Sequence, residues 1–192
     1  MRAFVSTFNV NVKSGLCQQA EFIESPNADP RPDNTLPQLI VVHGISLPPN
    51  QFGGQAITQL FTNTLNPEED LYFEKIKDLK VSAHALIHRD GSLIQYVPFH
   101  DRAWHAGASE FQGRANCNDF SIGIELEGTD NSCYTLKQYE TLSGLIKALW
   151  QVYPSLSAQH VVGHCDIAPG RKTDPGEFFQ WASLKRLLAT EA

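Results

Sequence analysis

The sequence lacks the long apolar runs that mark membrane proteins. No stretch of the 192 residues approaches the ~20 consecutive apolar residues that a membrane-spanning helix needs. Residues 1–7 carry one basic side chain, but their apolar run is broken at once, unlike that of a secretory signal. We therefore expect a cytoplasmic protein that does not associate with membranes.

Cysteines and basic residues are also scarce. The four cysteines lie far apart, without the spacing of a zinc ribbon or a redox pair, so we expect free, buried thiols at Cys17, Cys117, Cys133 and Cys165. Lysine and arginine number 15 against 21 acidic residues, which gives a net charge of −6. Nucleic-acid binding requires basic residues gathered on one surface. We expect a small-molecule ligand instead, with no nucleic acid and no obligate protein partner.

The sequence does contain clear strand patterns. Two runs of mostly β-branched residues, 39–42 and 161–163, end at His43 and His164 and predict buried strands. An Asp-Gly turn at Asp90 predicts a hairpin between two of the remaining strand patterns. These further patterns cover residues 8–12, 81–87, 93–97 and 120–126.

Helical spacing of apolar residues predicts helices over residues 57–65, 136–153 and 177–189. The second begins behind a capping box of Thr135 and Gln138, which satisfies free backbone donors at a helix start. Residues 24–37 contain four prolines and predict an ordered or extended connector. The whole pattern predicts the α/β class, with residues 1–192 forming a single domain whose central mixed β-sheet is flanked by helices.

The two histidines at strand ends are candidate ligands of a catalytic zinc ion. Strand ends form the mouth of open α/β sheets, and a catalytic zinc site has three protein ligands and one open position. Asp174 is the nearest candidate for the third ligand, although Asp174-Pro175-Gly176-Glu177 also has the pattern of a helix start. Cys165 and Asp166 are rival ligands. The residues alone favour neither interpretation of Asp174.

Two charged residues are candidates for catalysis near such a site. In residues 121–127, apolar side chains alternate with polar ones, so Glu125 and Glu127 share one face of the predicted strand. If that face lines a cleft, Glu125 can move a proton between water and a leaving amine. Lys172 can stabilise an oxyanion. A solvated surface position is the alternative for each side chain, and we favour it for Glu127, which lies nearer the end of the strand.

The chain resembles the AmpD-type 1,6-anhydro-N-acetylmuramyl-L-alanine amidases, a branch of the zinc amidase superfamily that includes phage T7 lysozyme and the peptidoglycan-recognition proteins. The similarity covers nearly the whole chain from residue 25. Its most specific segments are His43 with Ile45-Ser46-Leu47-Pro48-Pro49, then Gln51-Phe52-Gly53-Gly54, Val81-Ser82-Ala83-His84, Arg102-Ala103-Trp104-His105-Ala106-Gly107, and the stretches 117–130 and 163–176.

The resemblance implies zinc on His43, His164 and Asp174, and catalytic roles for Glu125 and Lys172. It also implies a reaction, the hydrolysis of the amide between the lactyl group of (1,6-anhydro-)N-acetylmuramic acid and L-alanine of the stem peptide, in cytosolic peptidoglycan recycling. The branch usually has Asn where this chain has Gly44, so we expect open space and a missing donor there. The candidate substrate-binding residues are Gly44, His84, Trp104 and His105.

Other functions remain open from the sequence. A non-catalytic peptidoglycan-binding module would keep the cleft and lose a ligand or a catalytic partner. A structural zinc protein would need a closed site of four protein ligands, with Cys165 or Asp166 as the fourth. A general muramyl-L-alanine amidase without preference for the anhydro sugar, or a zinc peptidase, would share the same chemistry.

Overall fold

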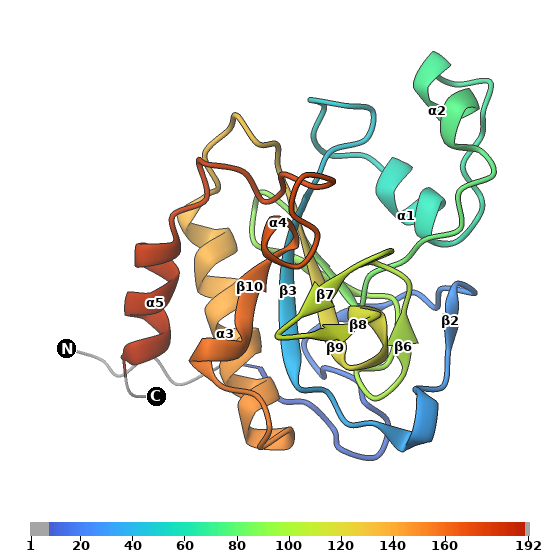
Figure 1. Ribbon diagram of the computed structural model, residues 1–192. Helices are drawn as coiled ribbons and strands as arrows, with labels where there is room; N and C mark the ends of the chain where they lie inside the picture. The colour runs from blue at the N-terminus through green and yellow to red at the C-terminus, as the bar shows by residue number, and fades with distance from the viewer. Residues whose placement is uncertain (1–7, 191–192) are drawn as a thin grey trace.

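A mixed six-stranded sheet forms the centre of the computed structural model, which describes residues 8–190 (Figure 1). Within it β4 and β5 pair antiparallel, and every other neighbouring pair is parallel. The mixed α/β class is thereby confirmed. In spatial order the strands are β1 (Glu21–Phe22), β5 (Leu93–Gln95), β4 (Ala85–Ile87), β9 (Ser121–Glu127), β3 (Leu39–Ile45) and β10 (Val161–Gly163).

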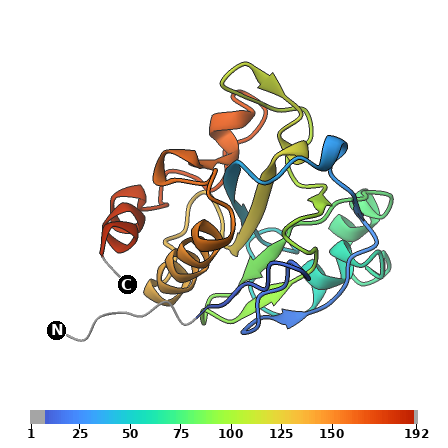
Figure 2. The ribbon, with the colours of Figure 1, turned by 90° about the horizontal axis from the view of Figure 1, so that it is seen from below.

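Helices cover both faces of this sheet (Figure 2). One face packs against α3 (Leu136–Val152) and α5 (Trp181–Ala189), in a core that includes Ile122 and Ile124 of β9. The other face is covered by α1 (Ala56–Phe61), α2 (Leu71–Ile76) and the short α4 (His164–Ile167). None of the helices in residues 8–190 is long and apolar enough to cross a membrane.

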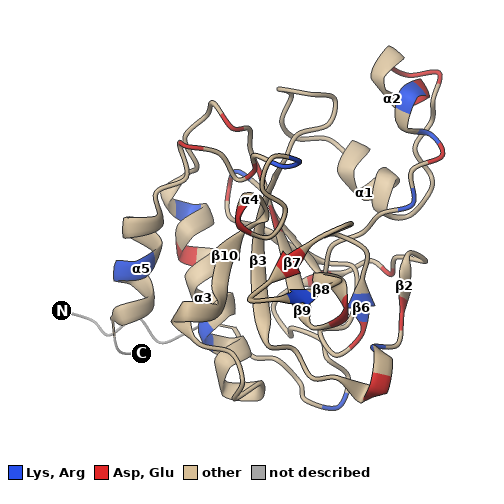
Figure 3. Cartoon of the chain, viewed as in Figure 1, with Lys and Arg blue, Asp and Glu red and all other residues tan. Residues whose placement is uncertain are grey.

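Smaller elements complete the chain around the sheet. Two of them are two-stranded antiparallel ribbons, and three are turns of 3-10 helix. The ribbons are β2 (Ala28–Asp29) with β6 (Arg102–Ala103), and β7 (Glu110–Phe111) with β8 (Arg114–Ala115). The turns are η1 (Pro32–Asn34), η2 (Cys117–Asp119) and η3 (Ala158–His160). In Figure 3 the lysines and arginines lie scattered among acidic residues over many elements.

The hydrophobic pattern explains why β3 and β9 lie at the centre of the sheet. Leu39 and Val41 of β3 face the α4 side, while Ile40 and Val42 face α3, and all four are fully buried. Parallel strands that are covered on both faces need such continuous apolar runs. The first polar residue after this run is His43, which therefore lies at the carboxyl end of the strand, still within the sheet.

The boundaries of several predicted elements need correction. The strand predicted over 81–87 is regular only in β4, and the one over 8–12 is reduced to a single bridge between Val10 and Cys17. The last helix begins at Trp181 instead of Glu177, and α2 was not predicted. The capping box of Thr135 and Gln138 is present at the start of α3.

Two further expectations are refined. The proline-rich segment 24–37 is ordered, and it contains β2, η1 and three buried polar side chains, Ser25, Asn27 and Arg31. All four cysteines are free, but only Cys17 and Cys117 are buried; Cys133 is exposed and Cys165 is half-buried. The expectation of four buried thiols is therefore half right.

Candidate metal centre and active site

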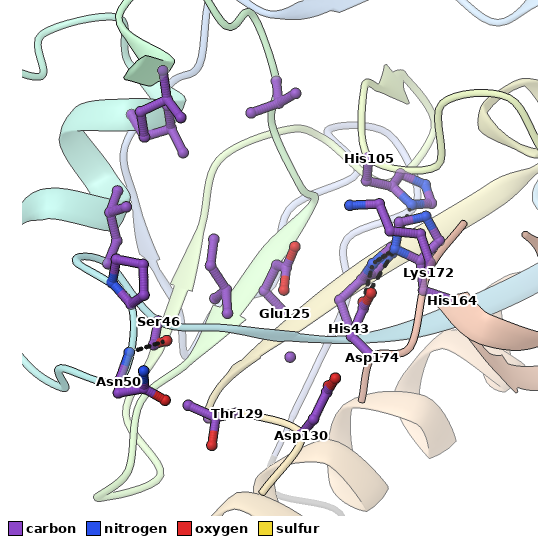
Figure 4. Close-up of a pocket in the computed structure, with 18 of the residues that line it drawn as sticks. His43, Ser46, Asn50, His105, Glu125, Thr129, Asp130, His164, Lys172 and Asp174 are labelled. Carbon is purple, nitrogen blue, oxygen red and sulfur yellow. Dashed lines mark hydrogen bonds and ion pairs between the residues drawn. The ribbon is translucent and has the colours of Figure 1, made fainter. Parts of the chain in front are cut away.

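Three predicted ligands meet at the carboxyl end of β3 (Figure 4). His43 is in β3, His164 begins α4 directly after β10, and Asp174 lies in the loop that follows α4. Nδ1 of His43 lies 2.9 Å from Nδ1 of His164. Oδ2 of Asp174 lies 3.2 Å from the first of these nitrogens and 3.1 Å from the second. Both histidines are buried.

The donor set fits a zinc ion. Nε2 of His164 lies 3.2 Å from the carbonyl oxygen of Ala106, which can only accept, so the neutral ring carries its proton there and Nδ1 has a free lone pair. That lone pair, a nitrogen of His43 and a carboxylate oxygen face one another at about 3 Å, an arrangement that a cation stabilises. Tetrahedral zinc with bonds of about 2.0–2.1 Å to nitrogen separates its ligand atoms by roughly 3.3 Å.

The rival explanations for these residues find no support in the geometry. Asp174 is not the cap of α5, because that helix begins at Trp181 with Gln180 as its N-cap. Oδ2 of Asp166 instead accepts a hydrogen bond of 2.7 Å from the backbone N–H of Gly163. Within residues 8–190, neither Asp166 nor Cys165 belongs to a cluster that could hold a metal ion, whereas His43, His164 and Asp174 do.

The charge states of the cluster reflect its burial. Burial lowers the pKa of His43 to about 4, against the influence of the Asp174 carboxylate. Burial also acts to raise the pKa of Asp174, but the close contacts with His164 and His43 outweigh it and hold this pKa well below its usual range. Neutral imidazoles and an ionised carboxylate are the forms that bind a metal ion.

Glu125 lies next to this cluster in β9, directly opposite His43 in the parallel register. Its side chain lines the same cavity, and its buried Oε2 has no hydrogen-bond partner. Burial, followed by the nearby Asp174 carboxylate, raises the pKa of Glu125 well above its ordinary value, while Lys172 acts in the opposite direction. A carboxyl group with a raised pKa and a free oxygen is suited to taking up and releasing a proton.

Lys172 approaches the cluster from the loop after α4. Figure 4 shows its side chain beside His105 and His164, and it lines the cavity. Its backbone N–H donates to the carbonyl of Ala168 at 3.0 Å, which helps to hold the loop. The ammonium group is thus available to a negative charge that develops near the cluster.

These groups lie at one end of a cavity of about 490 Å³. The lining of the cavity contains both polar and apolar side chains. The polar lining residues include Ser46, Asn50, Thr129, Asp130 and Asn131, and the apolar ones include Leu60, Phe61, Tyr72, Ile76, Leu79 and Val81. Many of the apolar lining residues come from α1, α2 and their flanking loops. The pattern of the sequence did not predict this contribution or α2 itself.

Two of the four predicted substrate-binding residues do not line this cavity. His84 is fully buried beneath the site, where Nδ1 accepts from the backbone N–H of Gly123 at 3.0 Å. The indole N–H of Trp104 donates to Asp29 at 3.2 Å. Gly44 and His105 do line the cavity. His84 is fully buried and therefore does not form a cleft wall, whereas substrate contact by the half-buried Trp104 stays a prediction.

The expectation that Gly44 leaves open space in the site is wrong. The hydroxyl of Tyr134 occupies the position where a β-carbon of residue 44 would lie, and it donates to the carbonyl of Pro175 at 2.9 Å. Gly128 faces the same tyrosine ring. Tyr134 was not identified from the sequence, although glycine near a strand end is a known sign that another group approaches the backbone closely.

Glu127 is buried, so the solvated surface position favoured from the sequence is wrong, and the residue has a structural role at this edge of the sheet. Its side chain is 2% exposed and accepts from the backbone N–H groups of Gly53 and Arg89. Its carboxylate also lies 3.5 Å from Nδ1 of His88. Glu127 therefore fastens the loop after β3 to the turn of the β4–β5 hairpin. Unlike Glu125, it does not line the cavity with the metal cluster.

The fold and the site are compatible with a hydrolase that can hold a metal ion, and comparison with known proteins identifies the family. The family model described as N-acetylmuramoyl-L-alanine amidase matches residues 32–177, and the chain belongs to this family. Among curated relatives, 1,6-anhydro-N-acetylmuramyl-L-alanine amidase AmpD of Escherichia coli is 53% identical over 180 residues, which cover 94% of this chain and 98% of the relative.

Solved structures agree with this assignment. A crystal structure of a selenomethionine derivative of AmpD has a TM-score of 0.90 at 53% identity, covering 93% of this chain and 98% of that one. AmpDh3 from Pseudomonas aeruginosa, solved in complex with anhydromuramic pentapeptide, has a TM-score of 0.62 at 28% identity, covering 86% of this chain and 62% of that one. The family resemblance inferred from the sequence is confirmed.

The contact between Gly44 and Tyr134 leads to a testable prediction. In Gly44→Ala, the new methyl group displaces the tyrosine hydroxyl, so the free energy of unfolding should fall by about 1–3 kcal/mol, as in other overpacked sites. In a Tyr134→Phe background that oxygen is absent, and the same change should cost less. Urea unfolding of the four proteins in a double-mutant cycle measures the difference. Additive effects would contradict this account of the contact.

Proposed function

We propose that this protein is a zinc-dependent amidase that hydrolyses the bond between the lactyl group of N-acetylmuramic acid and L-alanine of the stem peptide. The observation that carries the proposal is one cavity that combines a three-ligand cluster with the unpartnered carboxylate of Glu125. The names of relatives about 53% identical to this chain supply the substrate class.

The chain's own residues account for each requirement of the reaction. His43, His164 and Asp174 would hold the zinc ion and leave one position open toward the cavity. When bound, zinc lowers the pKa of a water molecule to about 7 and polarises a carbonyl oxygen. The apolar and polar lining residues would orient the muropeptide so that its lactyl carbonyl reaches this end of the cavity.

Glu125 moves the proton in this proposal. Its free Oε2 takes a proton from the attacking water, whose oxygen forms a bond to the lactyl carbonyl carbon. As the C–N bond breaks, the same carboxyl group returns the proton to the alanine nitrogen. Lys172 stabilises the negative charge on the carbonyl oxygen between these two steps. The products are a lactyl carboxylate and a peptide with a free amino terminus.

The sugar preference and the location are further parts of the proposal. Relatives of high identity are named for the 1,6-anhydro sugar, so we propose that small anhydromuropeptides from cell-wall turnover are the preferred substrates, processed in the cytoplasm. A peptidoglycan-binding module without activity is disfavoured, because all three cluster residues and both catalytic candidates lie together in one cavity.

Removal of one ligand should remove the metal. We expect wild-type protein to carry one zinc ion per chain and His164→Ala to lose it, because two remaining ligands cannot hold the ion tightly. Elemental analysis after gel filtration measures the zinc content. His160→Ala, a change at a half-buried histidine in η3, serves as the control and should keep the metal. A full equivalent of zinc in His164→Ala would refute the ligand assignment.

Loss of either catalytic partner should slow turnover without loss of zinc. For Glu125→Ala and Lys172→Ala we expect kcat to fall by ~10²-fold or more, since each group acts on the transition state. Glu127→Ala should lower stability, because the backbone N–H groups of Gly53 and Arg89 lose their acceptor, and should affect kcat much less. The comparison requires equal zinc content and folded protein. A larger loss of kcat in Glu127→Ala than in Glu125→Ala would overturn the assignment.

The anhydro preference is tested with a matched pair of substrates. We expect kcat/KM for an anhydromuramyl tripeptide to exceed that for its reducing-sugar counterpart by about 10–200-fold, the range that one or two lost contacts in a pocket produce. Mass spectrometry of the products identifies the bond that is cleaved. Equal values of kcat/KM would leave a general muramyl-L-alanine amidase and exclude the specialised recycling role.

A further inference from the structure

His105 lies against a metal-ligand candidate without belonging to the cluster itself. Its Nδ1 is 2.9 Å from Nε2 of His43, and the two rings meet edge to face with centroids 5.0 Å apart. Its other nitrogen, Nε2, is 3.1 Å from the hydroxyl of Ser121. Gly123 of β9 makes room for this ring, because a β-carbon at that position would overlap it. The histidine thus bridges β9 and the cluster.

The direction of these hydrogen bonds follows from Ser121. Its hydroxyl has a single hydrogen, which it donates to the carbonyl of Cys117 at 2.6 Å. The oxygen of Ser121 is therefore an acceptor toward His105, whose proton must lie on Nε2. In the neutral ring Nδ1 is then an acceptor, so Nε2 of His43 is the donor. His43 is left with a free lone pair on Nδ1, the atom that faces Asp174 and His164.

We infer that His105 is a positioning residue that holds His43 in the tautomer required for metal binding through Nδ1. The inference rests on the proposed zinc-dependent function. In this arrangement the carbonyl of Cys117 and the hydroxyl of Ser121 fix His105, and His105 fixes His43. Groups that orient metal-binding imidazoles in this way contribute to metal affinity even though they do not touch the ion.

The backbone around His105 orients the second histidine of the cluster as well. The side-chain oxygen of Asn118 accepts from the backbone N–H groups of His105 at 3.1 Å and Ala106 at 2.8 Å. The carbonyl of Ala106 in turn accepts from His164. One chain segment, anchored by Asn118, therefore sets the tautomers of both histidines. The segment of His105 and Ala106 thus contacts both His43 and His164, which are 121 residues apart in the sequence.

Zinc affinity of two variants separates this role from simple packing. His105→Leu removes the acceptor for His43 and should weaken zinc binding by about 10–100-fold in a chelator competition. His105→Asn places an oxygen near the position of Nδ1 and should recover most of the loss. The control is His84→Asn, a change at the neighbouring buried histidine, whose ring is 5.8 Å from that of His105. It should bind zinc like wild type.

If zinc binding were weakened equally in all three variants, the effect would come from packing, and the inference would be overturned. Full zinc affinity in His105→Leu would overturn it as well. A spectroscopic measurement needs no variant. Two-bond nitrogen–proton correlation spectra of the wild-type protein should show His105 neutral with its proton on Nε2; a proton on Nδ1 would also overturn the inference. If wild-type protein bound no zinc, the proposed function would fail, while this spectrum would still decide the tautomer of His105.

Discussion

The parallel register between β3 and β9 is the constraint on which the whole site depends. It pairs His43 with Glu125, so that the metal cluster and the proton-transfer group lie side by side on the face of the sheet away from α3. If β9 were shifted by one residue along β3, the side chain of Glu125 would point into the apolar core beneath α3. The buried isoleucines of β9, which pack against α3, therefore also determine where the catalytic carboxylate points.

Glycines at three positions allow aromatic rings to lie close to these central strands. Gly123 accommodates His105, whereas Gly44 and Gly128 face Tyr134. Each ring is hydrogen-bonded to the site: His105 to His43, and Tyr134 to the carbonyl of Pro175, the residue after Asp174. Both rings therefore lie next to the site only because these three positions carry no side chain. A β-carbon at any of them would overlap one of these two side chains.

The sequence predicted those parts of the site that depend on local pattern. The apolar runs before His43 and His164, and the alternation around Glu125, identified the strands and the faces of their polar residues. Local pattern left Asp174 undecided, because a helix-start motif is present there; in the structure an irregular segment follows it before α5 begins at Trp181. His84 and His105 look alike in the sequence, because only tertiary contacts decide which one is sealed beneath the site and which one reaches it.

The buried carboxylate of Glu127 couples the loop after β3, which lines the cavity at Ser46 and Asn50, to the turn of the β4–β5 hairpin. It binds N–H groups from Gly53 and from Arg89, while the guanidinium of Arg89 lies 4.9 Å from the centre of the Phe52 ring. This loop cannot move outward alone without depriving the buried carboxylate of a hydrogen-bond donor, which is costly. We therefore expect the loop after β3 and the hairpin turn to open together in local fluctuations, so that a change in the turn also alters the mobility of a loop that lines the cavity.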